Sequence, residues 1–332
     1  MEKSNLRIVF MGTPEFAVES LKRLVDGGYN VVAVVTQPDK PVGRHGSVLQ
    51  ASAVKQYALS KSIPVLQPVK MKDPAFIEEL RSYKADLQVV VAFRMLPEAV
   101  WAMPRFGTFN VHAALLPQYR GAAPINWAVI NGETTTGVTT FFLDHDIDTG
   151  RIIMQKKMDI PDDADVEYVY DGLMRLGADI CIETVDAVIV NDGAVESVPQ
   201  EEPSVLHSAP KIFKDTCRID FTMSAKRVYD FIRGLSPYPG AWCEIAKDGG
   251  RAAVLKLFKT AKTDLHADGA GRIKTEHGHL YISAGDNWLE IVELQLAGKK
   301  RMGAKDFLNG NKDIEDFSVV TADGSDTKHD KQ

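Results

Sequence analysis

The chain has 332 residues, of which 45% are hydrophobic and 25% charged, and its formal net charge is -6. This length predicts two domains rather than one core, and the composition is that of an ordinary globular protein. No apolar run is as long as a membrane span and the N-terminus leads directly into an expected strand, so we expect neither a membrane protein nor a signal peptide. Cys181, Cys217 and Cys243 are scattered without metal or disulfide spacing, which favours reduced thiols in a cytoplasmic protein.

The first 36 residues predict a β-α-β unit. Residues 6–11 are apolar throughout, as in a buried parallel strand, and residues 31–36 form the next strand. Between them we expect a helix capped by Thr13, with Pro14 in its first turn and Gly27 at its end. The turn reads G-T-P-E-F and lacks the glycines that let a pyrophosphate approach the backbone, which argues against a dinucleotide-dependent dehydrogenase.

Strands and helices continue to alternate as far as residue 191. We expect helices at residues 52–61, 74–83, 124–131 and 166–191, and strands near residue 65 and in "DLQVVVAF" and "GTFNVHAA". Two further strands flank an acidic loop in "TTGVTTFFLDHDIDTGRIIMQKKMDI". This alternation predicts an α/β domain with a doubly wound, mostly parallel sheet.

A change of pattern marks the second domain. The proline-rich and acidic residues 191–210 resemble a linker, and a capped helix followed by short strands with glycine-rich turns predicts a small β-barrel over residues 211–318. Residues 319–332 are expected to be a disordered tail. Residues 207–311 carry five more basic than acidic side chains, whereas residues 1–206 carry eight more acidic ones, so a polyanion such as nucleic acid is a possible partner of the second domain.

The segment "GTFNVHAALLPQYRGAAPINW" contains the strongest candidate site. Asn110 and His112 are two residues apart on a predicted strand, so their side chains face the same side near its carboxyl end. An amide can donate to a developing oxyanion and an imidazole can transfer a proton near neutral pH. A carboxylate partner could come from Asp144, Asp146 or Asp148 in "DHDIDTG". From spacing alone, a purely structural histidine is the more common alternative.

Five motifs carry a family resemblance that extends from residue 6 to about residue 309. They are "GTPEFAV", "TQPDKPVGR", "NVHAALLPQYRGAAPIN", "GVTTFFLDHDIDTG" and "LQLAGKKRM", and together they resemble the methionyl-tRNA formyltransferase family. The resemblance implies a Rossmann-like formyltransferase domain at residues 1–190, the linker at 191–210 and an OB-like β-barrel that binds tRNA at 211–318. It also implies transfer of the formyl group of 10-formyltetrahydrofolate to the α-amine of initiator methionyl-tRNA, for translation initiation.

The resemblance also assigns residues to roles. It implies that Asn110, His112 and Asp148 are catalytic, and it places folate binding on two segments. One is Ala114, Leu115, Leu116 and Pro117, where Ala114 replaces the usual serine; the other is Phe93, Arg94, Met95 and Leu96, which replaces a smaller segment containing glycine.

For tRNA, the resemblance points to Arg44 as a contact with the acceptor stem. The basic side chains of the second domain are candidates for phosphate contacts, in particular Lys211, Lys299, Lys300 and Arg301. A charged, solvated turn is the alternative reading of "GKKR". We expect no metal, no membrane and a monomer.

Two alternatives remain open. A formyltransferase acting on an amino-sugar nucleotide or a purine precursor would share the central motif, but a small acceptor would not need the basic barrel. A tRNA-binding module without catalysis would not need Asn110, His112 and Asp148 together.

Overall fold

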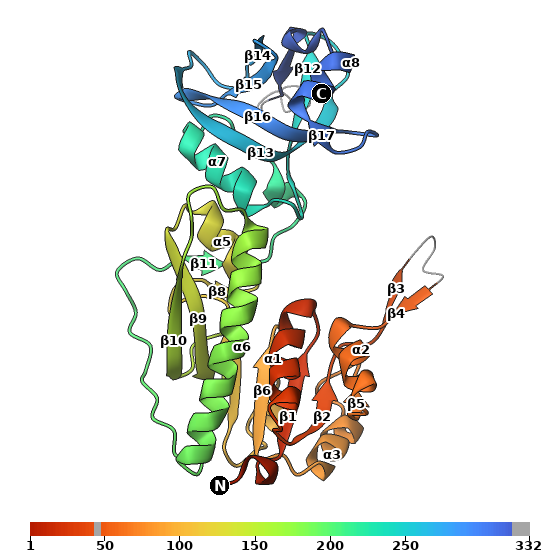
Figure 1. The fold of residues 1–332 in the computed structure, drawn as a ribbon, viewed down its shortest axis with the longest axis vertical. Helices are drawn as coiled ribbons and strands as arrows, with labels where there is room; N and C mark the ends of the chain where they lie inside the picture. Colours follow the sequence, from red (N-terminus) through yellow and green to blue (C-terminus); the bar gives the residue numbers. More distant parts are fainter. Residues whose placement is uncertain (43–47, 321–332) are drawn as a thin grey trace, which may run out of the picture. The chain divides into compact units, whose positions relative to one another are not determined.

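The computed structural model describes residues 1–42 and 48–320, which pack as two compact units (Figure 1). The first unit contains residues 1–124, 135–159 and 170–210. The second contains residues 125–134, 160–169 and the C-terminal part from residue 211. The chain therefore crosses between the units several times rather than once.

The first unit is built on a seven-stranded sheet with the order β10-β9-β7-β6-β1-β2-β5. Five strands of this sheet, β1, β2, β5, β6 and β7, are parallel, whereas β9 runs antiparallel to both β7 and β10. This confirms the prediction of a mostly parallel sheet. Every residue of β1 and β6 is buried, as expected for strands covered on both faces. The strands are β1 (Ile8–Gly12), β2 (Val31–Val35), β5 (Val65–Leu66), β6 (Leu87–Val91), β7 (Thr108–His112), β9 (Thr135–Phe142) and β10 (Ile152–Asp159).

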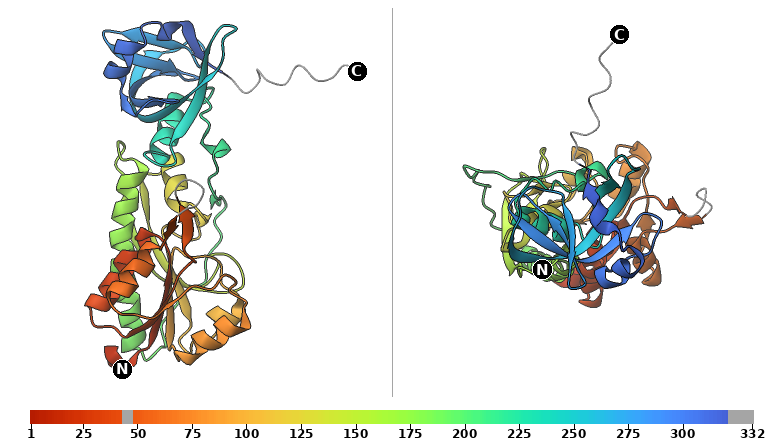
Figure 2. Two further views of the ribbon diagram at one scale, coloured as in Figure 1. Left: turned by 90° about the vertical axis from the view of Figure 1, so that its right-hand side faces the viewer. Right: turned by 90° about the horizontal axis from the view of Figure 1, so that it is seen from above.

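Helices cover both faces of this sheet (Figure 2). One face carries α3 (Pro74–Ser82) and α4 (Glu98–Trp101), whose Phe76, Leu80 and Val100 join a buried cluster with β1, β2 and β6. The other face carries α1 (Glu15–Asp26), α2 (Ala53–Ser60) and α6 (Val166–Val190). Ser52 and Asp73 cap α2 and α3 through their side chains.

One predicted cap is wrong. Helix α1 begins at Glu15 with Pro14 at its N-cap, and no side chain caps it, so Thr13 lies one residue too early to accept a bond from the first turn. The remaining helix in this part of the chain is α5 (Pro124–Ile130). Two further sheets have two strands each: β3 (Lys40–Val42) with β4 (Val48–Gln50), and β8 (Arg120–Gly121) with β11 (Ser208–Ala209).

The second unit is an antiparallel, nearly closed barrel. Its strands follow the order β14-β15-β16-β13-β12-β18, and a bridge between Arg272 and Ser318 brings its two edges together. Helix α7, capped by Ser224, packs Val228 and Ile232 against the barrel core. The elements are α7 (Ala225–Gly234), β12 (Ala241–Lys247), β13 (Ala253–His266), β14 (Ile273–Glu276), β15 (His279–Ser283), β16 (Asn287–Leu296), β17 (Met302–Gly303), α8 (Ala304–Gly310) and β18 (Phe317–Val319).

The start of the predicted tail needs correction. Strand β18 includes Val319, and the backbone N–H of Val320 donates to the carbonyl of Glu244. Pairing with β12 therefore satisfies backbone groups at the start of the predicted tail. The rest of the predicted tail lies outside the described residues. Within residues 1–42 and 48–320, no helix is long and apolar enough to cross a membrane.

Helix α6 offers a stability test at Gly177. A methyl group added there would lie 3.4 Å from Val111 Cγ1, which is ordinary van der Waals contact. Because glycine disfavours a helix interior relative to alanine, Gly177→Ala should raise the free energy of unfolding by about 0.5–1 kcal/mol. Urea denaturation measures the change. Gly137→Ala is the contrasting variant, since its methyl would lie 2.0 Å from the carbonyl oxygen of Lys156 and should destabilise. A destabilised Gly177→Ala protein would contradict the packing described here.

Candidate active site

Strand β7 presents Asn110 and His112 on one face of the sheet. The strand lies between β6 and β9, with Asn110 opposite Val90 and Phe141. Pairing on both sides fixes its backbone, and residues two apart on a strand point the same way. The two side chains therefore share a rigid platform.

The imidazole of His112 is held in one tautomer. Its Nε2 lies 2.9 Å from the carbonyl oxygen of Tyr119, and a carbonyl can only accept a hydrogen bond. Nε2 must therefore carry a proton, which leaves Nδ1 as the ring nitrogen free to gain or lose one. Only 6% of the His112 side chain is exposed, so bulk water has little access to this nitrogen.

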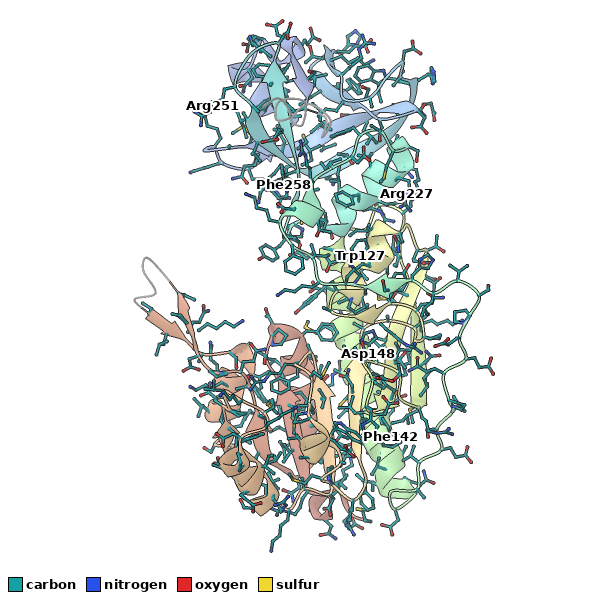
Figure 3. All side chains as sticks on the ribbon, turned by 180° about the vertical axis from the view of Figure 1, so that it is seen from behind. Trp127, Phe142, Asp148, Arg227, Arg251 and Phe258 are labelled. Atoms are coloured by element: carbon teal, nitrogen blue, oxygen red, sulfur yellow. The ribbon has the colours of Figure 1, made fainter. Side chains whose placement is uncertain are left out.

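Asp148 is the carboxylate that reaches His112. Asp148 is labelled in Figure 3. Its Oδ2 lies 3.7 Å from His112 Nδ1 and accepts a hydrogen bond of 2.9 Å from the backbone N–H of Gly121. The separation is too long for a hydrogen bond but suits an ion pair once the ring is protonated. Asp146 is exposed, and Asp144 instead accepts hydrogen bonds from Asp146 and Thr149 within its own loop.

Asn110 Oδ1 is buried and has no hydrogen-bond partner among the described residues. An unsatisfied buried polar atom costs roughly 1–3 kcal/mol, so such atoms are rare without a reason. Because Oδ1 is closed off from the surface, the Nδ2–H group is the end of this amide that a ligand could reach. The amide of Asn110, His112 and Asp148 together form a site suited to proton transfer beside a polar reacting group.

The segment Ala114 to Pro117 follows β7 and is tied down by two polar side chains. Thr139 Oγ1 donates to the carbonyl of Ala114 and accepts from the N–H of Leu116, while Gln155 donates to the carbonyl of Leu116. The side chain of Ala114 is fully buried, so this position faces the protein rather than solvent. The segment is thus preorganised, and Leu115 and Pro117 are its more accessible members.

The residues of the second predicted folate segment differ in their burial. Leu96 belongs to the buried core, whereas Met95 is exposed and Phe93 is partly buried. The guanidinium of Arg94 donates to the carbonyls of Pro68 and Val69. Leu96 therefore supports the segment from beneath, and only its neighbours can meet a ligand directly.

The predicted tRNA contacts also differ from one another. In the second unit, Lys211, Lys299 and Lys300 are exposed, and within residues 1–42 and 48–320 the latter two form no ion pair. Arg301 instead makes a two-point ion pair with Glu293, at 2.7 and 2.6 Å, above the ring of Phe258. Arg44 lies outside the described residues.

Several residues that shape the site could not be recognised from the sequence pattern. Tyr119 supplies the carbonyl that orients His112, and Thr139 and Gln155 hold the segment after β7. Gln200, within the predicted linker, hydrogen-bonds to the backbone of the Asp148 loop. Residues 191–210 thus belong to the first unit and make hydrogen bonds within it.

The comparisons with known proteins identify the family of this chain. Residues 6–185 match the family model described as formyl transferase, and residues 211–312 match that of the formyl transferase C-terminal domain. The chain is 60% identical over 325 residues to the methionyl-tRNA formyltransferase of Parabacteroides distasonis, covering 96% of this chain and 100% of the relative. It is 48% identical over 307 residues to that of Flavobacterium psychrophilum, covering 92% and 96%.

Solved structures share the fold at low identity. HypX from Aquifex aeolicus in complex with tetrahydrofolic acid aligns with a TM-score of 0.60 and 17% identity, covering 92% of this chain and 47% of that protein. The N-formyltransferase from Helicobacter canadensis, with folinic acid and dTDP-3-aminofucose, aligns with a TM-score of 0.60 and 20% identity, covering 91% and 100%. Fold and family models together define a formyltransferase. With relatives this similar over nearly its whole length, the chain belongs to the methionyl-tRNA formyltransferase family.

None of the three cysteines is placed to act as a nucleophile. All are buried and free, and burial raises the pKa of the Cys181 and Cys243 thiols to about 12. At pH 8 roughly one such thiol in 10⁴ would be ionised. We therefore expect both to resist iodoacetamide in the native protein and to react after denaturation, as measured by peptide mass spectrometry. Rapid labelling of either in the native state would show that the core opens readily.

Proposed function

We propose that this protein transfers the formyl group of 10-formyltetrahydrofolate to the α-amine of initiator methionyl-tRNA, giving N-formylmethionyl-tRNA for translation initiation. The observation that carries the proposal is the His112–Asp148 pair, with Asn110 on the same strand as His112, in a chain of this family. We further propose that it acts in the cytoplasm, as a monomer and without a metal.

His112 would move the proton. As the amine nitrogen bonds to the formyl carbon, Nδ1 takes one of its protons, since Nε2 is already committed to Tyr119. The carboxylate of Asp148, 3.7 Å away, then faces an imidazolium and stabilises it. When the bond from the formyl carbon to the folate nitrogen breaks, the same proton passes to that nitrogen, and His112 returns neutral.

Asn110 would stabilise the charge that develops on the formyl oxygen. Its Nδ2–H can donate to that oxygen. Removing one such donor costs roughly 3–4 kcal/mol of transition-state stabilisation in comparable sites. The amide thus binds the reacting groups more strongly as the reaction proceeds, which raises the rate.

Binding is proposed to be divided between the two parts of the chain. The folate would lie against Ala114, Leu115, Leu116, Pro117, Phe93, Arg94, Met95 and Leu96, some by direct contact and others as support. The tRNA would be held by the barrel of residues 211–318, through Lys211, Lys299, Lys300 and Arg301, and by Arg44. Residues 1–190 would carry the chemistry.

The direct test is formyl transfer from radiolabelled 10-formyltetrahydrofolate to purified methionyl-tRNA. An amino-sugar nucleotide and a purine-precursor amine, supplied at equal concentration, test the alternative acceptors. We expect product only on the tRNA. Transfer to a small amine alone would refute the proposed substrate, and tRNA binding without transfer to any acceptor would indicate a binding module.

His112→Ala and Asp148→Ala should each lower kcat by orders of magnitude while the KM for the folate changes little, because proton transfer is lost and the folate contacts remain. Two matched controls come from the same acidic loop: His145→Ala and Asp146→Ala remove exposed side chains of the same kinds. Steady-state kinetics of each variant measure kcat and the KM for the folate. Near-normal turnover in either site variant removes that residue from the proposed mechanism.

Replacing Lys299 and Lys300 together by alanine should raise the KM for methionyl-tRNA and weaken its dependence on salt. Each lost phosphate contact lowers the slope of log affinity against log salt by about 0.7–0.9. Titrating binding against potassium chloride measures this. Lys247→Ala is the control, since that amine is already paired with Asp313 and Asp316. An unchanged slope would show that these lysines do not contact phosphate.

A further inference from the structure

The side-chain amide of Gln200 is hydrogen-bonded on both of its ends. Its Nε2 donates to the carbonyls of Asp148 and Gly150, each at 2.8 Å. Its Oε1 accepts from Nε and Nη2 of Arg120, at 3.1 and 2.7 Å. Because a guanidinium only donates and a carbonyl only accepts, this arrangement fixes which way round the amide lies.

The backbone that carries Gln200 is fixed as well. Val198 and Ile152 exchange both backbone hydrogen bonds, at 2.8 and 2.9 Å, which sets the position of the segment two residues before Gln200. Farther along, β11 pairs with β8, which contains Arg120 and Gly121. Figure 1 shows the segment after α6 running along the edge of β10 toward β11.

These contacts converge on Asp148. This residue has a φ of +57°, a left-handed conformation that side chains other than glycine adopt only when their surroundings hold them there. Gln200 holds its carbonyl, while the N–H of Gly121 holds its carboxylate. The loop is thus held by hydrogen bonds from Gln200 and from Gly121. These two residues are themselves connected, because Arg120 precedes Gly121 and donates to Gln200.

We infer that Gln200 is a positioning residue, which sets the distance and angle at which the carboxylate of Asp148 meets His112 Nδ1. The inference rests on the proposed function, because it acts through the catalytic role proposed for Asp148. Gln200 touches neither substrate nor the reacting atoms. Its effect should therefore appear in turnover and not in substrate binding.

Gln200→Glu separates this role from packing. The glutamate is nearly isosteric and still accepts from Arg120, but it cannot donate to the two carbonyls of the Asp148 loop and repels them instead. We expect kcat to fall about 10- to 100-fold, the range typical of lost supporting hydrogen bonds, with both KM values nearly unchanged. Arg151→Ala is the matched control: it removes the contacts of Arg151 with Ser197, another anchor of the same segment, and should keep normal turnover.

A double-variant cycle distinguishes positioning from a general structural role. If Gln200 acts through Asp148, adding Gln200→Glu to Asp148→Ala should lower the single-turnover rate no further. Additive losses, or a normal kcat in Gln200→Glu, would overturn the inference. Should the glutamate reduce the melting temperature severely, Gln200→Ala takes its place in the same cycle. An inactive wild type would instead refute the proposed function, so the two failures are distinguishable.

Discussion

The hydrogen bond from His112 Nε2 to the carbonyl of Tyr119 determines what the site can do. It commits one ring nitrogen and leaves Nδ1, the one nearer Asp148, for proton transfer. The direction of that carbonyl depends in turn on the backbone of Tyr119, which has a φ of +60°. Its N–H donates to the carbonyl of His207, and the two rings stack 5.8 Å apart. The tautomer of a residue on the central sheet is thus set by a loop and by the chain segment beyond it.

That segment, from Ser197 to Ala209, contacts two parts of the candidate site. Gln200 contacts the Asp148 loop and His207 contacts Tyr119. It buries little apolar surface of its own, since Val198 and Val205 are about 60% exposed. Hydrogen bonds worth about 0.5–1.5 kcal/mol each therefore hold it, rather than hydrophobic burial. A segment held in this way should open at a lower free energy than the sheet beneath it. The geometry of the candidate site therefore depends on one of the less stable parts of the first unit.

How far the sequence could predict this arrangement follows from the kind of interaction involved. Buried parallel strands such as "DLQVVVAF" have a strong apolar signature. The parallel sheet and the alternation of strands and helices along the chain were predictable from it. Asn110 and His112 could be paired because strand geometry puts them on one face. The choice of Asp148 over Asp144 and Asp146 needed the family resemblance. The contacts of Gln200 could not be found at all, because its partners are backbone carbonyls, which every residue has.

The start of α1 and strand β18 were wrongly predicted because the local sequence pattern alone decides neither of them. Thr13 has the chemistry of a helix cap, but Pro14 takes the N-cap position and shifts the start of α1 by one residue. Strand β18 is only three residues long and lacks a pattern of its own, because its pairing with β12 and the bridge to Arg272 decide its conformation. Short elements held by distant partners carry little local signal.

Asn110 shows why the site requires such a rigid sheet. An asparagine whose amide oxygen is buried without a partner would lower its cost by turning toward any available donor. On a flexible loop it would do so, and the orientation of the whole amide would change. Strand β7 prevents this, because hydrogen bonds to β6 and β9 fix its backbone and direct the side chain to one face. The apolar packing of the central strands, fully buried at Val89, Val91 and Phe141, stabilises the sheet enough to offset roughly 1–3 kcal/mol of unsatisfied polarity. The unpaired oxygen is therefore a cost that the fold carries, and the rigid strand keeps the amide of Asn110 in one orientation.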